Sequence, residues 1–263
     1  MSLSSKPQNF RDAFQKEPQY LGAIINGLQK NYPDYARKIK GNLKVAEMHL
    51  GAWYELMVYD WLCKQGKYPY PEPTILDGKP DFVFTSNDKK IYVEVGSVKE
   101  SKKDKQLEER EDFVLTQTTA TFAAMRERLI DKACKYESVA TTGDAYVVCL
   151  GLESSLINIA DVKTCFLGDD GYNLSSGSIQ STINGDVFAR ENDGTFLVNY
   201  KHISAILVAT RNFTLNEDDN KLAFGLIQNP YAVNEIQPTE FGEILRFVVV
   251  TKKEKYFQMA WQN

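Results

Sequence analysis

The sequence predicts an α/β protein with a central mixed β-sheet flanked by helices. Two near-continuous apolar stretches, residues 144–152 and 203–213, are typical of strands buried on both faces of a sheet. Two shorter strand-like runs, residues 81–86 and 91–98, are separated by a polar turn and predict a hairpin. Helical patterns lie before and between these strands, which predicts helices packed on the sheet.

The other elements follow from local patterns. A helix is expected over residues 19–30, broken by Pro33 and Gly41, and a stronger helix runs from Asn42 to a stop near Gly66. Further along, the sequence predicts a long helix over 113–136, a helix over 153–166, an ordered insertion with a turn or small hairpin over 168–199, a strand over 221–232 and a final hairpin over 243–261. We therefore expect an N-terminal helical extension, residues 1–42, and one domain, residues 43–263, with an insertion near 168–199.

Composition and charge exclude several classes of function. The 263 residues are 43% hydrophobic and 25% charged, as in ordinary globular proteins. A net charge of −4 excludes nucleic-acid binding through a global positive field, so that any such contact needs a local basic patch. With two histidines and no CxxC pair, a zinc site and catalysis by paired histidines are excluded.

The cysteines and the hydropathy of the sequence predict the cellular compartment. The four cysteines are far apart in the sequence and are expected to be reduced and buried. No apolar run is long enough to span a bilayer, and the first residues lack the apolar core of a signal peptide. We therefore expect a cytoplasmic protein without a membrane partner.

Two acidic residues stand in the hairpin where burial makes a charge costly. Glu94 is the only charged residue between Ile91 and Val98, in a strand whose other residues are apolar or small. A carboxylate there must be paired, neutralised or bound to a cation. Asp81 follows Pro80 at the start of the preceding strand, and the hairpin would bring it near Glu94.

A third acid lies on the helix upstream of the hairpin. Glu55 belongs to a stripe of residues spaced by three or four, namely Met48, Ala52, Glu55, Tyr59 and Leu62. The other four suit burial, so Glu55 is expected to face the sheet. Three carboxylates are the ligands that Mg²⁺ or Mn²⁺ prefers, and such an ion would polarise a phosphate and activate a water. Each acid also has a structural alternative: Asp81 as a turn cap, Glu55 as a rim residue, and Glu94 as the partner of a helix lysine.

These residues resemble the PD-(D/E)XK nuclease superfamily, whose pattern is a helix glutamate, a Pro-Asp pair and an acid-x-lysine triplet on the next strand. The resemblance covers Glu55, Pro80-Asp81 and Glu94, over roughly residues 42–150, and by element order it extends to about Arg211. It implies a restriction-endonuclease-like core, divalent metal held by Glu55, Asp81 and Glu94, and cleavage of phosphodiester bonds.

One position departs from the family pattern. Gly96 stands where the motif lysine is expected. In the family this lysine orients the attacking water, and some members supply it from another element. The candidates here are Lys99 and, on the long helix, Lys132 and Lys135, of which Lys132 is favoured because it lies closer to the helix face formed by Met125, Leu129 and Tyr136.

Three functions remain open. The first is a Mg²⁺- or Mn²⁺-dependent DNA endonuclease of a restriction or defence system, with Glu55, Asp81, Glu94 and Lys132 in the active site. RNA is a second substrate, basic residues at 99–105 or 126–135 would contact phosphates, and a homodimer would cut both strands. The second is an inactive nuclease-fold protein that binds nucleic acid or protein. The third is an unrelated enzyme acting on a phosphate ester or nucleotide, which has little support because no P-loop and no GxGxxG is present.

Overall fold

The fold comes from a computed structural model, and the sheet at its centre confirms the predicted α/β class. The structure describes residues 18–99, 119–153, 162, 169–173, 178–182, 200–210, 222–229, 231–242, 246–252 and 257–262. Within these ranges, the main sheet has eight strands in the order β1-β2-β3-β4-β7-β8-β9-β10. The strands are β1 (Tyr70–Pro71), β2 (Phe82–Ser86), β3 (Lys89–Val98), β4 (Ala145–Leu152), β7 (Ile203–Thr210), β8 (Ala223–Gln228), β9 (Arg246–Lys252) and β10 (Phe257–Gln262).

The sheet is mixed. β3, β4 and β7 run parallel at its centre, and β8 and β9 are also parallel. The remaining neighbours, β1-β2, β2-β3, β7-β8 and β9-β10, are antiparallel. β4 and β7 are buried at every position, as expected for strands covered on both faces.

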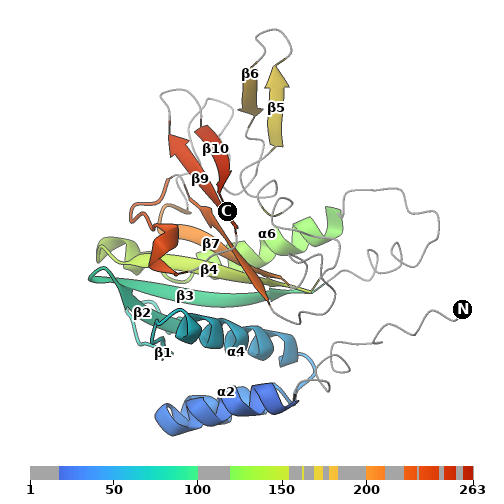
Figure 1. Cartoon of the computed structure of the whole chain (residues 1–263), viewed down its shortest axis with the longest axis vertical. Coiled ribbons are helices and arrows are strands. Elements are labelled where there is room, and N and C mark those ends of the chain that lie inside the picture. Colours follow the sequence, from blue (N-terminus) through green and yellow to red (C-terminus); the bar gives the residue numbers. More distant parts are fainter. Residues whose placement is uncertain are drawn as a thin grey trace, which may run out of the picture.

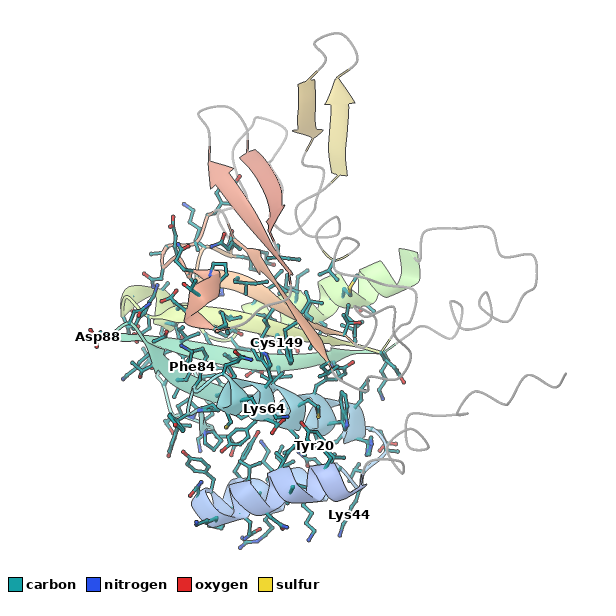
Figure 2. All side chains as sticks on the ribbon, viewed as in Figure 1. Tyr20, Lys44, Lys64, Phe84, Asp88 and Cys149 are labelled. Atoms are coloured by element: carbon teal, nitrogen blue, oxygen red, sulfur yellow. The ribbon has the colours of Figure 1, made fainter. Side chains whose placement is uncertain are left out.

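Helices cover both faces of the sheet (Figure 1). On one face lies α4 (His49–Lys64), with α2 (Pro18–Asn31) and α3 (Pro33–Asn42) packed beyond it, and on the other lies α6 (Thr119–Ala133). Successive residues of β3 divide between these layers: Val93 and Val95 join the core under α4, whereas Tyr92 and Val98 join the core under α6. Figure 2 shows the side chains that fill the space between α4 and the sheet. None of the described helices is both long and apolar enough to cross a membrane.

The hairpin that carries two of the acids forms as predicted. Asn87 and Asp88 both have positive φ, 50° and 60°, which is the geometry of a tight two-residue turn that matches strand twist. The turn is therefore shorter than the predicted one, and Lys89 and Lys90 already belong to β3. The final hairpin, β9-β10, is also confirmed.

The N-terminal helices differ from the prediction. Pro33 and Gly41 do not leave an irregular segment, because residues 33–42 form α3, with Pro33 in its first turn, where a missing backbone N–H costs little. The following helix begins at His49 and not at Asn42. Met48 therefore precedes the helix and is 54% exposed, so it does not belong to the buried stripe.

The described cysteines are less buried than expected. Of the cysteines that the structure describes, Cys149 is buried, Cys63 is half-buried and Cys134 is exposed, and all three are free thiols.

The insertion contains the expected small hairpin, β5 (Asp169–Asn173) with β6 (Ser178–Thr182). The predicted helix over 153–166 and the charged segment 100–112 lie outside the described residues, apart from Glu153 and the helical Val162.

Candidate functional site

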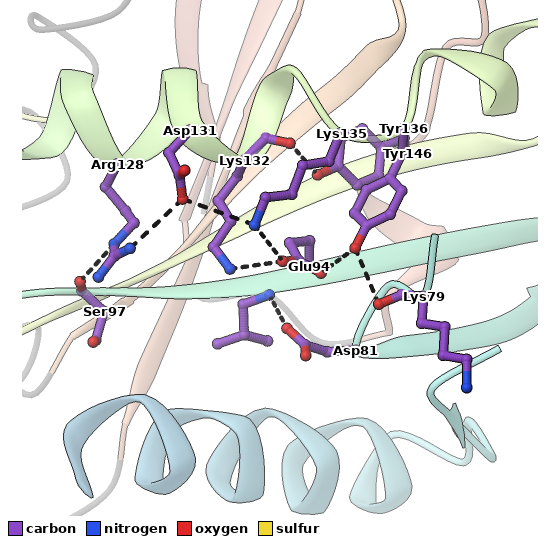
Figure 3. Close-up of polar contacts among 11 residues, drawn as sticks. Lys79, Asp81, Glu94, Ser97, Arg128, Asp131, Lys132, Lys135, Tyr136 and Tyr146 are labelled. Atoms are coloured by element: carbon purple, nitrogen blue, oxygen red, sulfur yellow. Dashed lines mark hydrogen bonds and ion pairs between the residues drawn. The ribbon is translucent and has the colours of Figure 1, made fainter. Parts of the chain in front are cut away.

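The hairpin register brings Asp81 beside Glu94. Phe82 pairs with Val93, so that Asp81, one residue earlier, comes opposite Glu94. The Val95 N–H donates a hydrogen bond of 2.7 Å to Asp81 Oδ2, which fixes this carboxylate against β3. In Figure 3, Glu94 extends toward α6 while Asp81 lies on the other side of β3, nearer α4. The predicted closeness of these two acids is confirmed.

Glu94 is buried and receives its partners from α6 and the segment that follows it. Lys132 Nζ lies 2.6 Å from Glu94 Oε1, and the side chains of the two residues are only 14% and 6% exposed. The Tyr136 hydroxyl lies 3.2 Å from Glu94 Oε2 and 3.0 Å from the carbonyl oxygen of Lys79, two residues before Asp81. The Tyr136 hydroxyl therefore connects Glu94 to the segment just before β2, in which Asp81 lies.

Gly96 leaves the space that α6 side chains occupy. A Cβ atom at Gly96 would lie 3.1 Å from Cγ and Cδ of Arg128 and 3.5 Å from Cε of Lys132. Gly96 also faces the same side of β3 as Glu94, because the two residues are two apart in a strand. Gly96 stands at the position where the family pattern has its lysine. Beside it lies the Lys132 side chain, which extends from α6 to Glu94.

The end of α6 is held in place by buried polar groups. The Tyr146 hydroxyl donates a 2.9 Å hydrogen bond to the carbonyl oxygen of Lys132, and a ring nitrogen of His202 contacts the carbonyl oxygen of Ala133. The rings of Tyr146 and His202 stack at an interplanar angle of 8°. These contacts satisfy carbonyls that a helix end leaves without intrahelical partners, and they fix the turn that carries Lys132.

Glu55 lies on α4, and its neighbour Tyr54 fixes that helix against the sheet. A Cβ atom at Gly151 would come within 2.3 Å of the Tyr54 ring, so glycine is required at this position of β4. The Tyr54 hydroxyl donates a 2.6 Å hydrogen bond to the Leu152 carbonyl oxygen. Glu55 itself accepts a 3.1 Å hydrogen bond from the hydroxyl of Tyr35, a buried residue of α3.

Electrostatics link the three carboxylates. Burial, and then the negative charges of Glu55 and Glu94, raise the pKa of Asp81 well above its ordinary value, and the hydrogen bond from Val95 and the charge of Lys132 only partly oppose this. Burial also raises the pKa of Glu55, opposed by the Lys38 charge, the Tyr35 hydrogen bond and the Lys132 charge. The three acids therefore share one electrostatic environment.

The donor chemistry suits a divalent cation, although the side chains are not arranged around one. Burial and two other carboxylates raise the pKa of Asp81, the Lys132 charge opposes this only in part, and a bound cation would add positive charge. An all-oxygen donor set is what Mg²⁺ and Mn²⁺ prefer. However, no group of three His, Cys, Asp or Glu residues in the described part of the chain is placed to hold a metal ion.

The other predicted site residues are farther away or outside the described part. Lys135 Nζ lies 4.0 Å from Glu94 Oε1, and its side chain is 42% exposed. Lys99 is exposed, residues 100–105 lie outside the described ranges, and the Arg126 side chain does as well.

Sequence reasoning missed two tyrosines at the site. Tyr136 follows Lys132 by four residues, and this spacing is a signal that could have found it. Tyr35 lies 20 residues before Glu55, in the segment where Pro33 and Gly41 were expected to break the helix, so no local pattern pointed to it.

Comparisons with protein-family models, with curated proteins and with solved structures gave no match to this chain.

Proposed function

We propose that this chain is a divalent-metal-dependent nuclease with a restriction-endonuclease-like core, of the PD-(D/E)XK type, that hydrolyses DNA phosphodiester bonds. The observation that carries the proposal is the contact of 2.6 Å between Lys132 Nζ and Glu94 Oε1, beside Gly96. In the family pattern a lysine belongs two residues after this glutamate. Here a helix lysine reaches the same region, and the space directly beside the glycine holds the Arg128 side chain.

Glu55, Asp81 and Glu94 would hold Mg²⁺ or Mn²⁺, with Glu94 releasing one oxygen from its present partners. The bound ion would supply Lewis-acid polarisation of the scissile phosphate and a more acidic water. Hydrolysis adds the water oxygen to phosphorus and breaks one phosphorus–oxygen ester bond, which leaves a phosphate monoester and a hydroxyl group. Lys132, as an ammonium held beside Glu94, would orient the water and stabilise charge that develops on the phosphate.

The substrate and partners follow from the same proposal. The negative net charge requires a local basic surface, and the Lys and Arg residues of α6 and of residues 99–105 are the candidates for phosphate contacts. DNA is the proposed substrate, with RNA as the second polymer that this chemistry admits. A homodimer would place two active sites on the two strands of a duplex, as in a restriction or defence endonuclease, and the enzyme would act in the cytoplasm.

The second candidate is a catalytically inactive nuclease-fold protein that binds nucleic acid or protein. A specific observation favours it: each oxygen of the Glu94 carboxylate has a side-chain partner within the chain, Lys132 for one and Tyr136 for the other. A buried ion pair of this kind can be purely structural. Both candidates predict the same contact, and they differ in whether divalent metal binds and bonds are cut.

Cleavage assays separate the two candidates. The purified chain is incubated with supercoiled plasmid, single-stranded DNA and RNA in Mg²⁺, in Mn²⁺ and in chelator. The nuclease proposal predicts cleavage of DNA that requires the metal and that falls by at least about 100-fold in Asp81→Asn and in Glu94→Gln. The matched control is Asp60→Asn, which removes an acid that pairs with Lys64 at 2.6 Å on another face of α4.

The assays have clear contrary outcomes. Cleavage that persists in chelator, or that survives both substitutions, would refute the proposed active site. Absence of cleavage on every substrate, combined with no binding of Mn²⁺, would support the inactive protein instead.

A further inference from the structure

We infer that Arg128 of α6 is a substrate-binding residue that holds a phosphate of the DNA backbone beside the pair of Lys132 and Glu94. The inference rests on the proposed function, because it names a contact between the proposed nuclease and its substrate. The fold fixes the guanidinium group of Arg128 in place and pairs it only loosely with a carboxylate. This is the arrangement that an anion-binding arginine needs.

Gly96 gives the Arg128 side chain its place on β3. A Cβ atom at Gly96 would lie 3.1 Å from Cγ and Cδ of Arg128, so the stem of the arginine packs directly on the strand backbone. Arg128 Nε donates a 3.2 Å hydrogen bond to the carbonyl oxygen of Ser97 (Figure 3). This bond uses one of the five N–H groups of the guanidinium and, with the packed stem, orients the terminal nitrogens.

Arg128 reaches β3 close to the point where Asp81 does. The pairing of β2 with β3 ends at Val93, so the next part of β3 lies beside β4 alone among the described strands. In that part the Val95 N–H donates to Asp81. Two residues further on, about 7 Å along an extended strand, the Ser97 carbonyl oxygen accepts from Arg128. A single DNA substrate can therefore contact both places.

The charge of Arg128 is compensated less closely than that of Lys132. Lys132 Nζ lies 2.6 Å from the buried Glu94 carboxylate. Arg128 Nη1 lies 3.7 Å from Asp131, which is longer than a charge-assisted hydrogen bond. Asp131 is also 3.9 Å from Lys135 Nζ, and the side chains of Arg128, Asp131 and Lys135 are all at least 42% exposed. A phosphate can therefore bind between the arginine and Lys135, in competition with Asp131.

A second pair of an arginine and an aspartate supplies the matched control. Arg37 and Asp34 are also three residues apart on a helix, with 3.0 Å between Nη1 and Oδ1, and their side chains are 77% and 91% exposed. They belong to α3, on the opposite face of the sheet from α6 (Figure 1). If Arg128 were only one half of an ordinary surface ion pair, replacing either arginine would have the same small effect on DNA binding.

The test is the fluorescence anisotropy of a short labelled DNA duplex, titrated with the purified chain in chelator at several salt concentrations. We expect Arg128→Gln to weaken binding by about 10-fold and to reduce the slope of log Kd against log salt by about one, as loss of one phosphate contact does. Arg37→Gln should bind as the wild type does. Asp131→Asn should tighten binding by about 3-fold, because a competing carboxylate is removed.

Two further measurements separate binding from folding and from catalysis. Arg128→Lys keeps the charge and should keep the salt slope of the wild type, which a folding defect would not explain. In cleavage assays, Arg128→Gln should raise KM by about 10-fold with kcat nearly unchanged, since the arginine binds substrate and takes no part in bond cleavage.

The contrary outcomes are distinct. Equal DNA affinity in Arg128→Gln and the wild type would overturn the inference but not the nuclease proposal. An equal loss of affinity in Arg128→Gln and Arg37→Gln would overturn it as well, since DNA would then respond to overall charge and not to a built site. If the wild type neither binds nor cuts DNA, the proposed function itself fails.

Discussion

Asp81 lies where the folded chain disfavours a negative charge. Its carboxylate is held by the Val95 N–H, but burial and the charges of Glu55 and Glu94 raise its pKa well above the ordinary value of 3.8. The folded chain therefore keeps a proton on Asp81 at a pH where the unfolded chain has lost it. This residue's contribution to stability is full below the unfolded pKa and is lost as the pH rises through the folded pKa.

Removal of that charge should stabilise the metal-free protein. Asp81→Asn keeps the shape of the side chain and an acceptor for the Val95 N–H, so at neutral pH we expect the free energy of unfolding to rise by about 1 kcal/mol. Urea unfolding in chelator measures this. The gain should disappear when the pH is lowered below the unfolded pKa, and Asp60→Asn should show no comparable gain.

The opposite result would have a definite meaning. If Asp81→Asn were less stable than the wild type at neutral pH, the Asp81 charge would be compensated within the fold. The case for a cation at this site would then lose its electrostatic basis.

At the scale of elements, the motif is divided between a strand and a helix. β3 supplies Glu94 and Gly96, and α6 supplies Lys132, whose turn is fixed by Tyr146. We expect cleavage to depend only on where the lysine ammonium lies and not on the element that carries it. A lysine at position 96 of β3 should then replace Lys132 of α6.

The double variant Gly96→Lys, Lys132→Met makes this exchange. Lys132→Met alone should lower the cleavage rate at saturating Mn²⁺ by about 100-fold, and the double variant should recover about 10-fold of that loss. A Cβ atom at position 96 meets Cγ and Cδ of Arg128 at 3.1 Å, so the Arg128 side chain, which is 42% exposed, has to shift by a few tenths of an ångström in the double variant. Full activity in Lys132→Met, together with a large loss in the comparison variant Lys135→Met, would assign the role to Lys135 instead.

The elements also show what the sequence could and could not predict. The hairpin was predictable because a polar turn separates two strand-like runs, and its register then determines that Asp81 lies near Glu94. The contact between Lys132 and Glu94 was anticipated from helix periodicity, although two other lysines were also candidates. The start of α4 at His49 was not predictable, because residues 43–48 have a helix-like composition but form turns after α3.

At the scale of the whole molecule, the site lies where three layers meet. Glu55 belongs to α4, on one face of the sheet. Figure 3 shows that Glu94 of β3 points toward Lys132 of α6, on the other face, and that Asp81 lies on the side nearer α4. α2 and α3 pack into the same core as α4 and β3, through residues that include Leu28, Ala36 and Ile39. Long-range packing of this kind leaves no local pattern, which is why the sequence did not reveal that Tyr35 reaches Glu55.

The central claim is that the three acids share a divalent cation, and diffraction from crystals soaked in Mn²⁺ tests it most directly. The account predicts one anomalous peak between Glu55, Asp81 and Glu94, with carboxylate oxygens at about 2.1 Å and the Lys132 ammonium nearby. No peak at that place, with Lys132 and Tyr136 still bound to Glu94 and Glu55 turned toward Tyr35, would contradict the claim.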